Sequence, residues 1–206
     1  MPKITAFKTH SDAYDEWFVI NSDLYAAELK IVRQMLPEST DKGLEVGIGS
    51  GKFAEPLGIK LGVEPCEQMA EKARRLGIEV HPGVAEALPF ADNSFEFVLL
   101  VTTICFVDDV LKTFQEALRV LQPGGCLLVG FVDRDSEMGA QYEANREKSK
   151  FYQEATFFST QELLHSLKEA GFTDLNSKQT LIPDTPQGTI RDGFGEGAFV
   201  VIKGVK

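Results

Sequence analysis

The stretch GLEVGIGSGKFA, residues Gly43 to Ala54, decides the fold that we predict for this chain. It has the pattern of a short buried strand that runs into three glycines and then into the start of a helix, which is the layout of a nucleotide-binding turn. Glycine at such a turn lets the backbone approach a ligand closely. We therefore expect the ligand site of this protein to begin at Gly47, Gly49 and Gly51.

The spacing of these glycines separates the kinds of glycine loop that the stretch could form. A phosphate-binding loop needs a glycine at position 46 and a hydroxyl at position 53, where Val46 and Phe53 stand. The dinucleotide fingerprint G-x-G-x-x-G, started at Gly49, is met only in its relaxed form with Ala54 in the last place. The spacing excludes the phosphate loop and leaves the dinucleotide interpretation weakly supported.

Two acidic residues favour a third kind of site. The pattern Glu45-x-Gly47-x-Gly49-x-Gly51 resembles the first motif of class I S-adenosylmethionine-dependent methyltransferases. Glu64 ends the next apolar strand, nineteen positions after Glu45 (64 minus 45). A carboxylate there can accept hydrogen bonds from both ribose hydroxyls of a nucleoside. We expect this carboxylate to be solvated when no ligand is bound.

Two later blocks are similar to further motifs of the same family. Residues Gly83 to Glu96 resemble its third motif, and by this resemblance Ala85 and Glu86 contact the adenine. The step Arg119 to Gly125, which reads Arg-Val-Leu-x-Pro-Gly-Gly, is another hallmark of the family. The chain thus resembles the ubiquinone- and menaquinone-methyltransferase-like subgroup, the type 11 methyltransferases.

The resemblance implies a single α/β domain over residues 1–206. Its core would be a three-layer Rossmann-like sheet of seven strands in the order 3-2-1-4-5-7-6, with the last strand antiparallel. Residues 1–40 would form an N-terminal helical lid, 41–135 the cofactor-binding half and 136–206 the substrate-side half. The helix predicted after the glycine turn is unusually short, so another element must help to cover that face of the sheet.

The resemblance also implies the site residues. On the cofactor side they are Glu45, Gly47, Gly49, Gly51, Glu64, Pro65, Ala85, Glu86 and Thr102. On the substrate side they are Tyr14, Trp17, Phe106 and Asp133. The segment Tyr14 to Phe18 is similar to one that folds over the cofactor in many relatives, although its aromatic spacing also fits core packing. Asp133 follows the fifth strand and is a candidate general base, with a solvated loop acid as the alternative.

Composition limits the partners of the protein. The net charge is −10 and the acids are spread along the chain, which argues against binding to nucleic acid. Its three cysteines have no C-x-x-C spacing, so we expect no metal site and a reducing, cytoplasmic environment. No apolar run reaches membrane-spanning length. We expect a small-molecule acceptor, bound beside the aromatic-rich segment Ser136 to Phe158 by a monomer or a homodimer.

The sequence therefore predicts methyl transfer from S-adenosylmethionine to a small molecule, with S-adenosylhomocysteine as the product. The displacement would be in line and aided mainly by proximity, which can supply roughly 7 to 11 kcal/mol of the barrier. Two other classes stay open. A catalytically silent protein that binds S-adenosylmethionine or S-adenosylhomocysteine would keep these motifs and lack a substrate cavity. A nicotinamide-dependent oxidoreductase shares the glycine turn, but the expected seventh strand argues against it.

Overall fold

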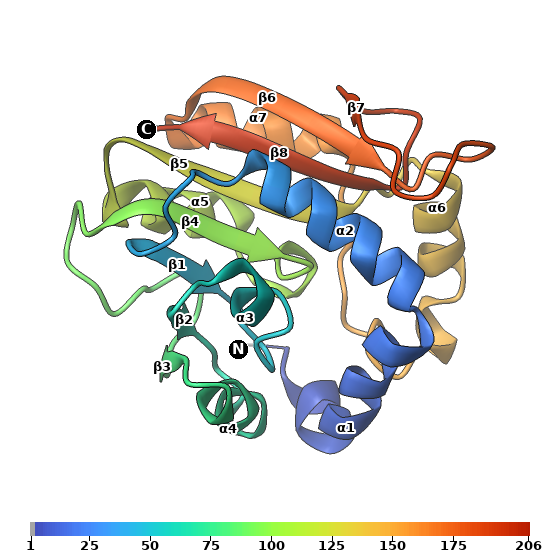
Figure 1. The fold of residues 1–206 in the computed structure, drawn as a ribbon, viewed down its shortest axis with the longest axis horizontal. Coiled ribbons are helices and arrows are strands. Elements are labelled where there is room, and N and C mark those ends of the chain that lie inside the picture. Colours follow the sequence, from blue (N-terminus) through green and yellow to red (C-terminus); the bar gives the residue numbers. More distant parts are fainter. Residues whose placement is uncertain (1–2) are drawn as a thin grey trace.

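The computed structural model describes residues 3–206, and an eight-stranded sheet forms its centre (Figure 1). The strand order is β3-β2-β1-β4-β5-β8-β6-β7. Strands β1 to β5 pair in parallel, and β8 runs antiparallel between β5 and β6. The strands are β1 (Gly43–Val46), β2 (Leu61–Val63), β3 (Glu79–His81), β4 (Phe95–Val101), β5 (Leu121–Val132), β6 (Thr173–Thr180), β7 (Arg191–Asp192) and β8 (Phe199–Val205).

This topology confirms the predicted sheet with one addition. The predicted sixth and seventh strands are β6 and β8, so the first seven positions of the sheet follow the expected order. The addition is β7, a two-residue strand that pairs with β6 at the edge of the sheet. It lies in a segment rich in glycine, proline and charged residues, a composition typical of a loop. So short a strand leaves no hydrophobic pattern by which to predict it.

Helices cover both faces of the sheet and make it the middle of three layers. Helices α5 and α7 contact each other on one face, whereas α2 lies across the other face (Figure 1). Helices α1 and α6 lie beyond the carboxyl ends of the parallel strands (Figure 1). The helices are α1 (Thr5–Ile20), α2 (Ser22–Met35), α3 (Ala54–Leu57), α4 (Glu67–Arg75), α5 (Val110–Val120), α6 (Glu137–Ala144) and α7 (Thr160–Ala170), with 3₁₀ turns η1 (Ile104–Phe106) and η2 (Arg146–Lys148).

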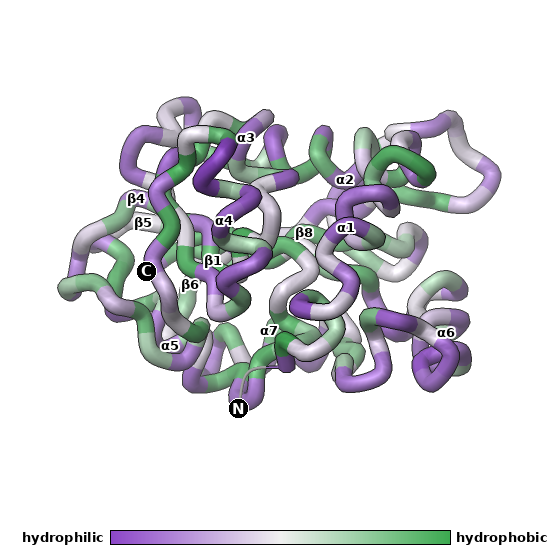
Figure 2. Tube along the Cα trace, turned by 90° about the horizontal axis from the view of Figure 1, so that it is seen from below, coloured by the Kyte–Doolittle hydropathy of each residue, from purple (hydrophilic) through white to green (hydrophobic). Residues whose placement is uncertain are grey.

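Helix α2 supplies the cover that the short crossover helix cannot. Helix α3 has only four residues, and α2 contacts β5, β6 and β8 on the same side of the sheet. Ile31 and Val32 of α2 are fully buried in one cluster with Phe97 and Phe199 of the sheet. In Figure 2 the hydrophobic colours follow the central strands, while α4 and α6 are largely hydrophilic.

The helices differ in how they are capped. Helix α1 begins at Thr5 without a side-chain cap, and its backbone leaves helical geometry at His10 (φ −127°, ψ 31°). Helix α2 begins at Ser22, also without a side-chain cap. Asp109 caps α5, because its side chain accepts a hydrogen bond from the Lys112 amide at 2.9 Å.

Helix α7 begins with a capping box, which provides a test of the fold. The Ser159 hydroxyl accepts from the Glu162 amide at 3.3 Å, and the Glu162 carboxylate accepts from the Ser159 amide at 2.8 Å. We expect Ser159→Ala to lower the free energy of unfolding by about 1 kcal/mol, the usual loss for a missing cap. Urea denaturation measures this loss. The control is Ser166→Ala on the exposed side of α7, and equal losses in both variants would contradict the assignment.

Candidate functional site

The carboxyl ends of β1, β2 and β4 open into a cavity of about 710 Å³. This is the edge of a parallel sheet at which ligands bind, and the volume is that of a small-molecule site. The wall is largely apolar and aromatic, with a few carboxylates and hydroxyls. Helix α1, the turns after the three strands, and residues between 142 and 152 form it. The cavity therefore joins segments that lie far apart in the sequence.

The glycine turn adopts a backbone that favours glycine. Gly47, Gly49 and Gly51 have φ angles of +68°, +56° and +83°. Gly47 and Gly49 line the cavity, and a Cβ atom added to Gly49 would meet only Met69 Cε at 3.6 Å and the Tyr14 hydroxyl at 3.7 Å. The Gly49 backbone is thus open to a ligand, as the motif predicts. Gly51 does not line the cavity.

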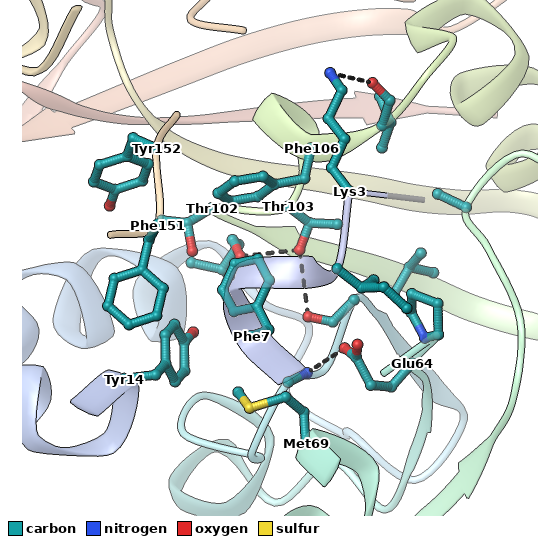
Figure 3. A pocket seen from close by; sticks show the side chains of 18 of the residues that line it. Lys3, Phe7, Tyr14, Glu64, Met69, Thr102, Thr103, Phe106, Phe151 and Tyr152 are labelled. Carbon is teal, nitrogen blue, oxygen red and sulfur yellow. Dashed lines mark hydrogen bonds between the residues drawn. The ribbon is translucent and has the colours of Figure 1, made fainter. Parts of the chain in front are cut away.

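Glu64 lies against this turn and faces the cavity (Figure 3). Its Oε2 accepts from the Gly49 amide at 2.8 Å, and its Oε1 accepts from the Cys66 amide at 2.9 Å. The residue is only 7% exposed, and this burial raises the pKa of the carboxyl to about 6 although both amides oppose the shift. The expectation of a solvated carboxylate was wrong, because the glycine turn encloses it. Each oxygen keeps a free lone pair for a ligand hydroxyl.

Glu45 lies beneath the turn, outside the cavity wall. Its Oε2 atom is buried and has no hydrogen-bond partner. Among the side-chain oxygen and nitrogen atoms of residues 3–206, it is the only buried one of which this is true. Burial raises the pKa of this carboxyl well above its ordinary value, with some opposition from the Ala54 amide. Burial beneath the turn thus leaves one Glu45 oxygen without a donor from the described part of the chain. The Glu64 carboxylate and the open Gly49 backbone, which do face the cavity, fit a ligand with hydroxyl donors, and S-adenosylmethionine has such donors on its ribose.

The predicted adenine contacts also lie at the cavity. Ala85 and Glu86 line it. The Glu86 carboxylate, however, accepts from the Asp108 amide at 2.6 Å and the Asp109 amide at 3.2 Å, so it is tied to the residues before α5. Pro65 and Thr102 complete this side of the wall, and Thr102 has a positive φ of +50°.

Asp133 does not belong to the cavity wall. Its side chain is buried. It accepts one hydrogen bond from the Thr160 hydroxyl at 2.5 Å and another from the Asp135 amide at 3.0 Å. These contacts join the end of β5 to the start of α7. Asp133 is therefore neither placed to act as a general base nor a solvated loop acid, and its role is structural.

Helix α1 closes one side of the cavity. Phe7 and Tyr14 line the cavity, and the Phe7 ring contacts Phe106 at 5.0 Å and Phe151 at 5.7 Å between centroids (Figure 3). Trp17 also lines the cavity. The helix supplies the lid that the sequence predicts with these residues. Core packing, the alternative interpretation, also applies to this segment, because Phe18 is 7% exposed and belongs to a buried cluster against which Tyr14 and Trp17 pack.

Asp15 attaches α1 to the glycine turn. One of its carboxylate oxygens accepts from the Ser50 hydroxyl at 2.6 Å, and the other accepts from the Lys72 ammonium group at 2.9 Å. The same ammonium group donates to Asp12 at 2.7 Å. Hydrogen bonds therefore join the lid directly to the segment that the motif assigns to the cofactor.

The sequence analysis missed several residues of the wall, of which Glu28 is the most informative. This glutamate of α2 is only 5% exposed and lines the cavity, and burial raises the pKa of its carboxyl to about 8. A signal was present in the sequence. Glu28 stands three and four positions before Ile31 and Val32, so it is an acid within the apolar stripe of an amphipathic helix. Phe53 is a further missed residue of this wall, whereas Tyr142, Phe151 and Tyr152 belong to the segment Ser136 to Phe158 that the sequence places beside the acceptor.

These buried acids predict how stability depends on pH. The folded protein raises the pKa of Glu28 to about 8 and that of Glu64 to about 6, from 4.5, and raises that of Glu45 as well. Between these pKa values the folded state holds protons that the unfolded state releases. The contribution of the three carboxyl groups to the free energy of unfolding is therefore complete below pH 4.5 and is lost as the pH rises. We expect the free energy of unfolding, measured in urea without ligand, to fall between pH 5 and pH 8. Glu28→Gln should flatten the upper part of this curve, and a wild-type stability that rises over the range would contradict the prediction.

Within the described residues, no group of three or more His, Cys, Asp or Glu side chains is placed to hold a metal ion. Cys66, Cys105 and Cys126 are free thiols. None of the helices between residues 3 and 206 is both long enough and apolar enough to cross a membrane.

Comparison with known proteins agrees with this geometry. Residues 44–129 match the family described as "Methyltransferase domain". A crystal structure from Thermotoga maritima, described as a S-adenosylmethionine-dependent methyltransferase and possible histamine N-methyltransferase, is 47% identical, with a TM-score of 0.93 over 98% of this chain and 99% of that one. An uncharacterized protein of Methanocaldococcus jannaschii is 38% identical over 98% of this chain and its own full length. Demethylmenaquinone methyltransferase of Chlorobaculum parvum is 34% identical over 50% of this chain and 46% of its own.

Proposed function

The chain belongs to the class I S-adenosylmethionine-dependent methyltransferases, and we propose that its cavity holds S-adenosylmethionine beside a small-molecule methyl acceptor. The observation that carries this proposal is the position of Glu64. Its carboxylate faces a cavity of about 710 Å³ and is fixed there by the Gly49 and Cys66 amides. An immobilised carboxylate at a strand end is the group that binds a ribose diol with charge assistance.

Each part of the wall has a distinct task in this proposal. Glu64 binds the ribose, the open Gly49 backbone admits the cofactor, and Ala85 lies at the adenine end. The bound cofactor supplies a methyl group on a positively charged sulfur, and the electron pair of the broken carbon–sulfur bond stays on that sulfur. The aromatic rings of the lid exclude water and hold the acceptor in line. Such alignment can supply roughly 7 to 11 kcal/mol of the barrier.

Three observations support a small acceptor. The cavity is partly closed by α1, so it suits a compact ligand. The chain carries a net charge of −10, which disfavours nucleic acid. The acceptor named in the description of the Thermotoga maritima relative is also a small molecule. The cavity further argues against a catalytically silent binding protein, and the antiparallel β8 argues against a nicotinamide-dependent oxidoreductase.

Two assays on the purified protein test the proposal. Calorimetric titration should detect binding of S-adenosylmethionine and S-adenosylhomocysteine, with none of NAD. Turnover assays with amines, phenols, thiols and tRNA should then detect methylation of a small molecule. Tight NAD binding without S-adenosylmethionine binding would overturn the cofactor assignment. Methylation of tRNA alone would overturn the acceptor class.

A further inference from the structure

Glu28 brings a carboxyl group to a part of the cavity that the cofactor motifs do not explain. It comes from the middle of α2, whereas the motif residues lie on the turns after β1, β2 and β4. None of the hydrogen bonds or ion pairs within residues 3–206 involves this carboxyl, although the residue is 5% exposed. Burying it as an anion without a partner is expensive, which is why burial raises its pKa and favours the neutral form. A cation that enters the cavity would supply the partner that the anion lacks.

Aromatic side chains line the same cavity as this carboxylate, and its charge acts on three of them, Tyr14, Tyr142 and Tyr152. Tyr14 and Trp17 reach the cavity from α1, Tyr142 from α6, and Tyr152 from the segment after η2. The rings of Tyr142 and Tyr152 are stacked, with centroids 5.4 Å apart and planes 25° apart. Figure 3 shows the rings of Tyr14 and Tyr152 on one side of the cavity, and the Tyr14 hydroxyl also reaches toward Gly49, whose amide donates to Glu64. Aromatic faces attract cations, most strongly where water is excluded.

We propose that Glu28 and these four aromatic residues form an amine subsite, and that the methyl acceptor is a primary or secondary amine bound there as its ammonium ion. The inference rests on the proposed function, because it names the acceptor class of the same cavity. An ammonium ion satisfies the Glu28 carboxylate and the ring faces at once. A phenol, thiol or alcohol offers a proton to Glu28 but brings no positive charge to the rings.

In the proposed step Glu28 also moves a proton. Its carboxylate takes a proton from the bound ammonium ion and becomes a carboxylic acid, which leaves a lone pair on the amine nitrogen. That nitrogen forms the new bond to the methyl carbon, and the electron pair of the broken carbon–sulfur bond stays on the sulfur. The product amine carries the positive charge that the sulfur loses, and Glu28 later releases the proton to water.

The groups around Glu28 suit such a proton transfer. The titratable side chains that face it are tyrosines, namely Tyr14 from α1, Tyr142 from α6, Tyr152 after η2 and Tyr25 on its own helix. Burial raises the pKa of all four, so they stay neutral. The Glu28 carboxyl, with a pKa raised to about 8, holds a proton at pH 7 in the free protein. Because free amines are charged at this pH, binding should release about one proton per amine.

Calorimetry on the complex with S-adenosylhomocysteine tests the proposal. The probes are phenethylamine, butylamine and N-methylbenzylamine, each paired with the alcohol or ether of the same shape. We expect the wild type to bind at least one amine more tightly than its neutral partner. The enthalpy, measured in buffers of different ionisation enthalpy, should report release of about one proton. Glu28→Gln should weaken amine binding about ten- to hundredfold and abolish proton release.

Two controls separate this proposal from the cofactor assignment. Glu28→Gln should bind S-adenosylhomocysteine as tightly as the wild type and should unfold at a higher temperature, which shows that it is folded. The matched control Glu16→Gln changes an exposed glutamate of α1 and should leave amine binding unchanged. Equal binding of amines and neutral partners, or amine binding by Glu28→Gln with proton release intact, would overturn the amine subsite. A wild type that fails to bind S-adenosylhomocysteine would instead overturn the proposed function.

Discussion

Glu64→Gln is expected to weaken binding of S-adenosylmethionine by roughly 1.5 to 3 kcal/mol, about ten- to hundredfold. Glutamine keeps the size of the side chain, removes its charge and replaces one acceptor oxygen with a donor nitrogen. In the folded protein both oxygens already accept backbone amides, from Gly49 and from Cys66. The side-chain nitrogen of glutamine is a donor, so it cannot accept a hydrogen bond from a backbone amide or from a ribose hydroxyl. The variant therefore loses hydrogen bonds both to the ligand and to the turn.

Calorimetric titration at constant ionic strength measures this loss. The control is Glu71→Gln, the same change at an exposed position of α4, which should bind as tightly as the wild type. Thermal unfolding without ligand checks that both variants are folded. Equal affinity in Glu64→Gln and the wild type would mean that the nucleoside lies elsewhere, and the assignment of this cavity would fail with it.

Gly47→Ala is expected to lower the free energy of unfolding by about 2 to 5 kcal/mol. The φ angle of +68° costs an alanine roughly 1 to 2 kcal/mol. The new Cβ would also lie 2.4 Å from Thr103 Cγ2 and 2.5 Å from Thr103 Oγ1, and such overpacking usually costs about 1 to 3 kcal/mol. Because Gly47 lines the cavity, the strain should also displace the turn and weaken cofactor binding.

Gly77→Ala provides the matched comparison in urea denaturation. Gly77 has a φ of +81°, but a Cβ added there would meet no atom within 4 Å, so this variant reports the backbone strain alone. We expect it to lose roughly 1 to 2 kcal/mol, the backbone share of the Gly47 estimate. The difference between the two variants then measures the collision with Thr103. Equal losses would show that the turn shifts freely around Gly47.

The cofactor side of the site could be predicted because local chemistry determines it. The spacing in the sequence identifies three glycines after β1 and an acid at the end of β2. In the structure the glycines have positive φ angles, and the Glu64 carboxylate lies against the turn that contains Gly47 and Gly49. The order of the strands follows from the alternation of apolar runs with helices. The spacing could not predict that the Glu64 carboxylate is buried, because its burial depends on how the glycine turn folds back over it.

The substrate side could not be predicted in the same way, because it depends on contacts between distant segments. Asp133 was placed correctly at the end of its strand, but its side chain is held by Thr160, twenty-seven residues later. Glu28 and Tyr142 reach one cavity from α2 and α6. Only the packing of both helices at the edge of the sheet brings them together. An acid in an apolar stripe signals such a site without showing what lies opposite.

The two sides of the cavity also have separate positions in the chain. The family match covers residues 44–129, which contain the glycine turn and Glu64. Glu28 precedes this region, and Tyr142 and Tyr152 follow it. Mutations can therefore accumulate at the acceptor wall while selection for cofactor use preserves the central region. Descendants of one ancestral methyltransferase can inherit the same methyl donor and still diverge in the metabolite that each of them modifies.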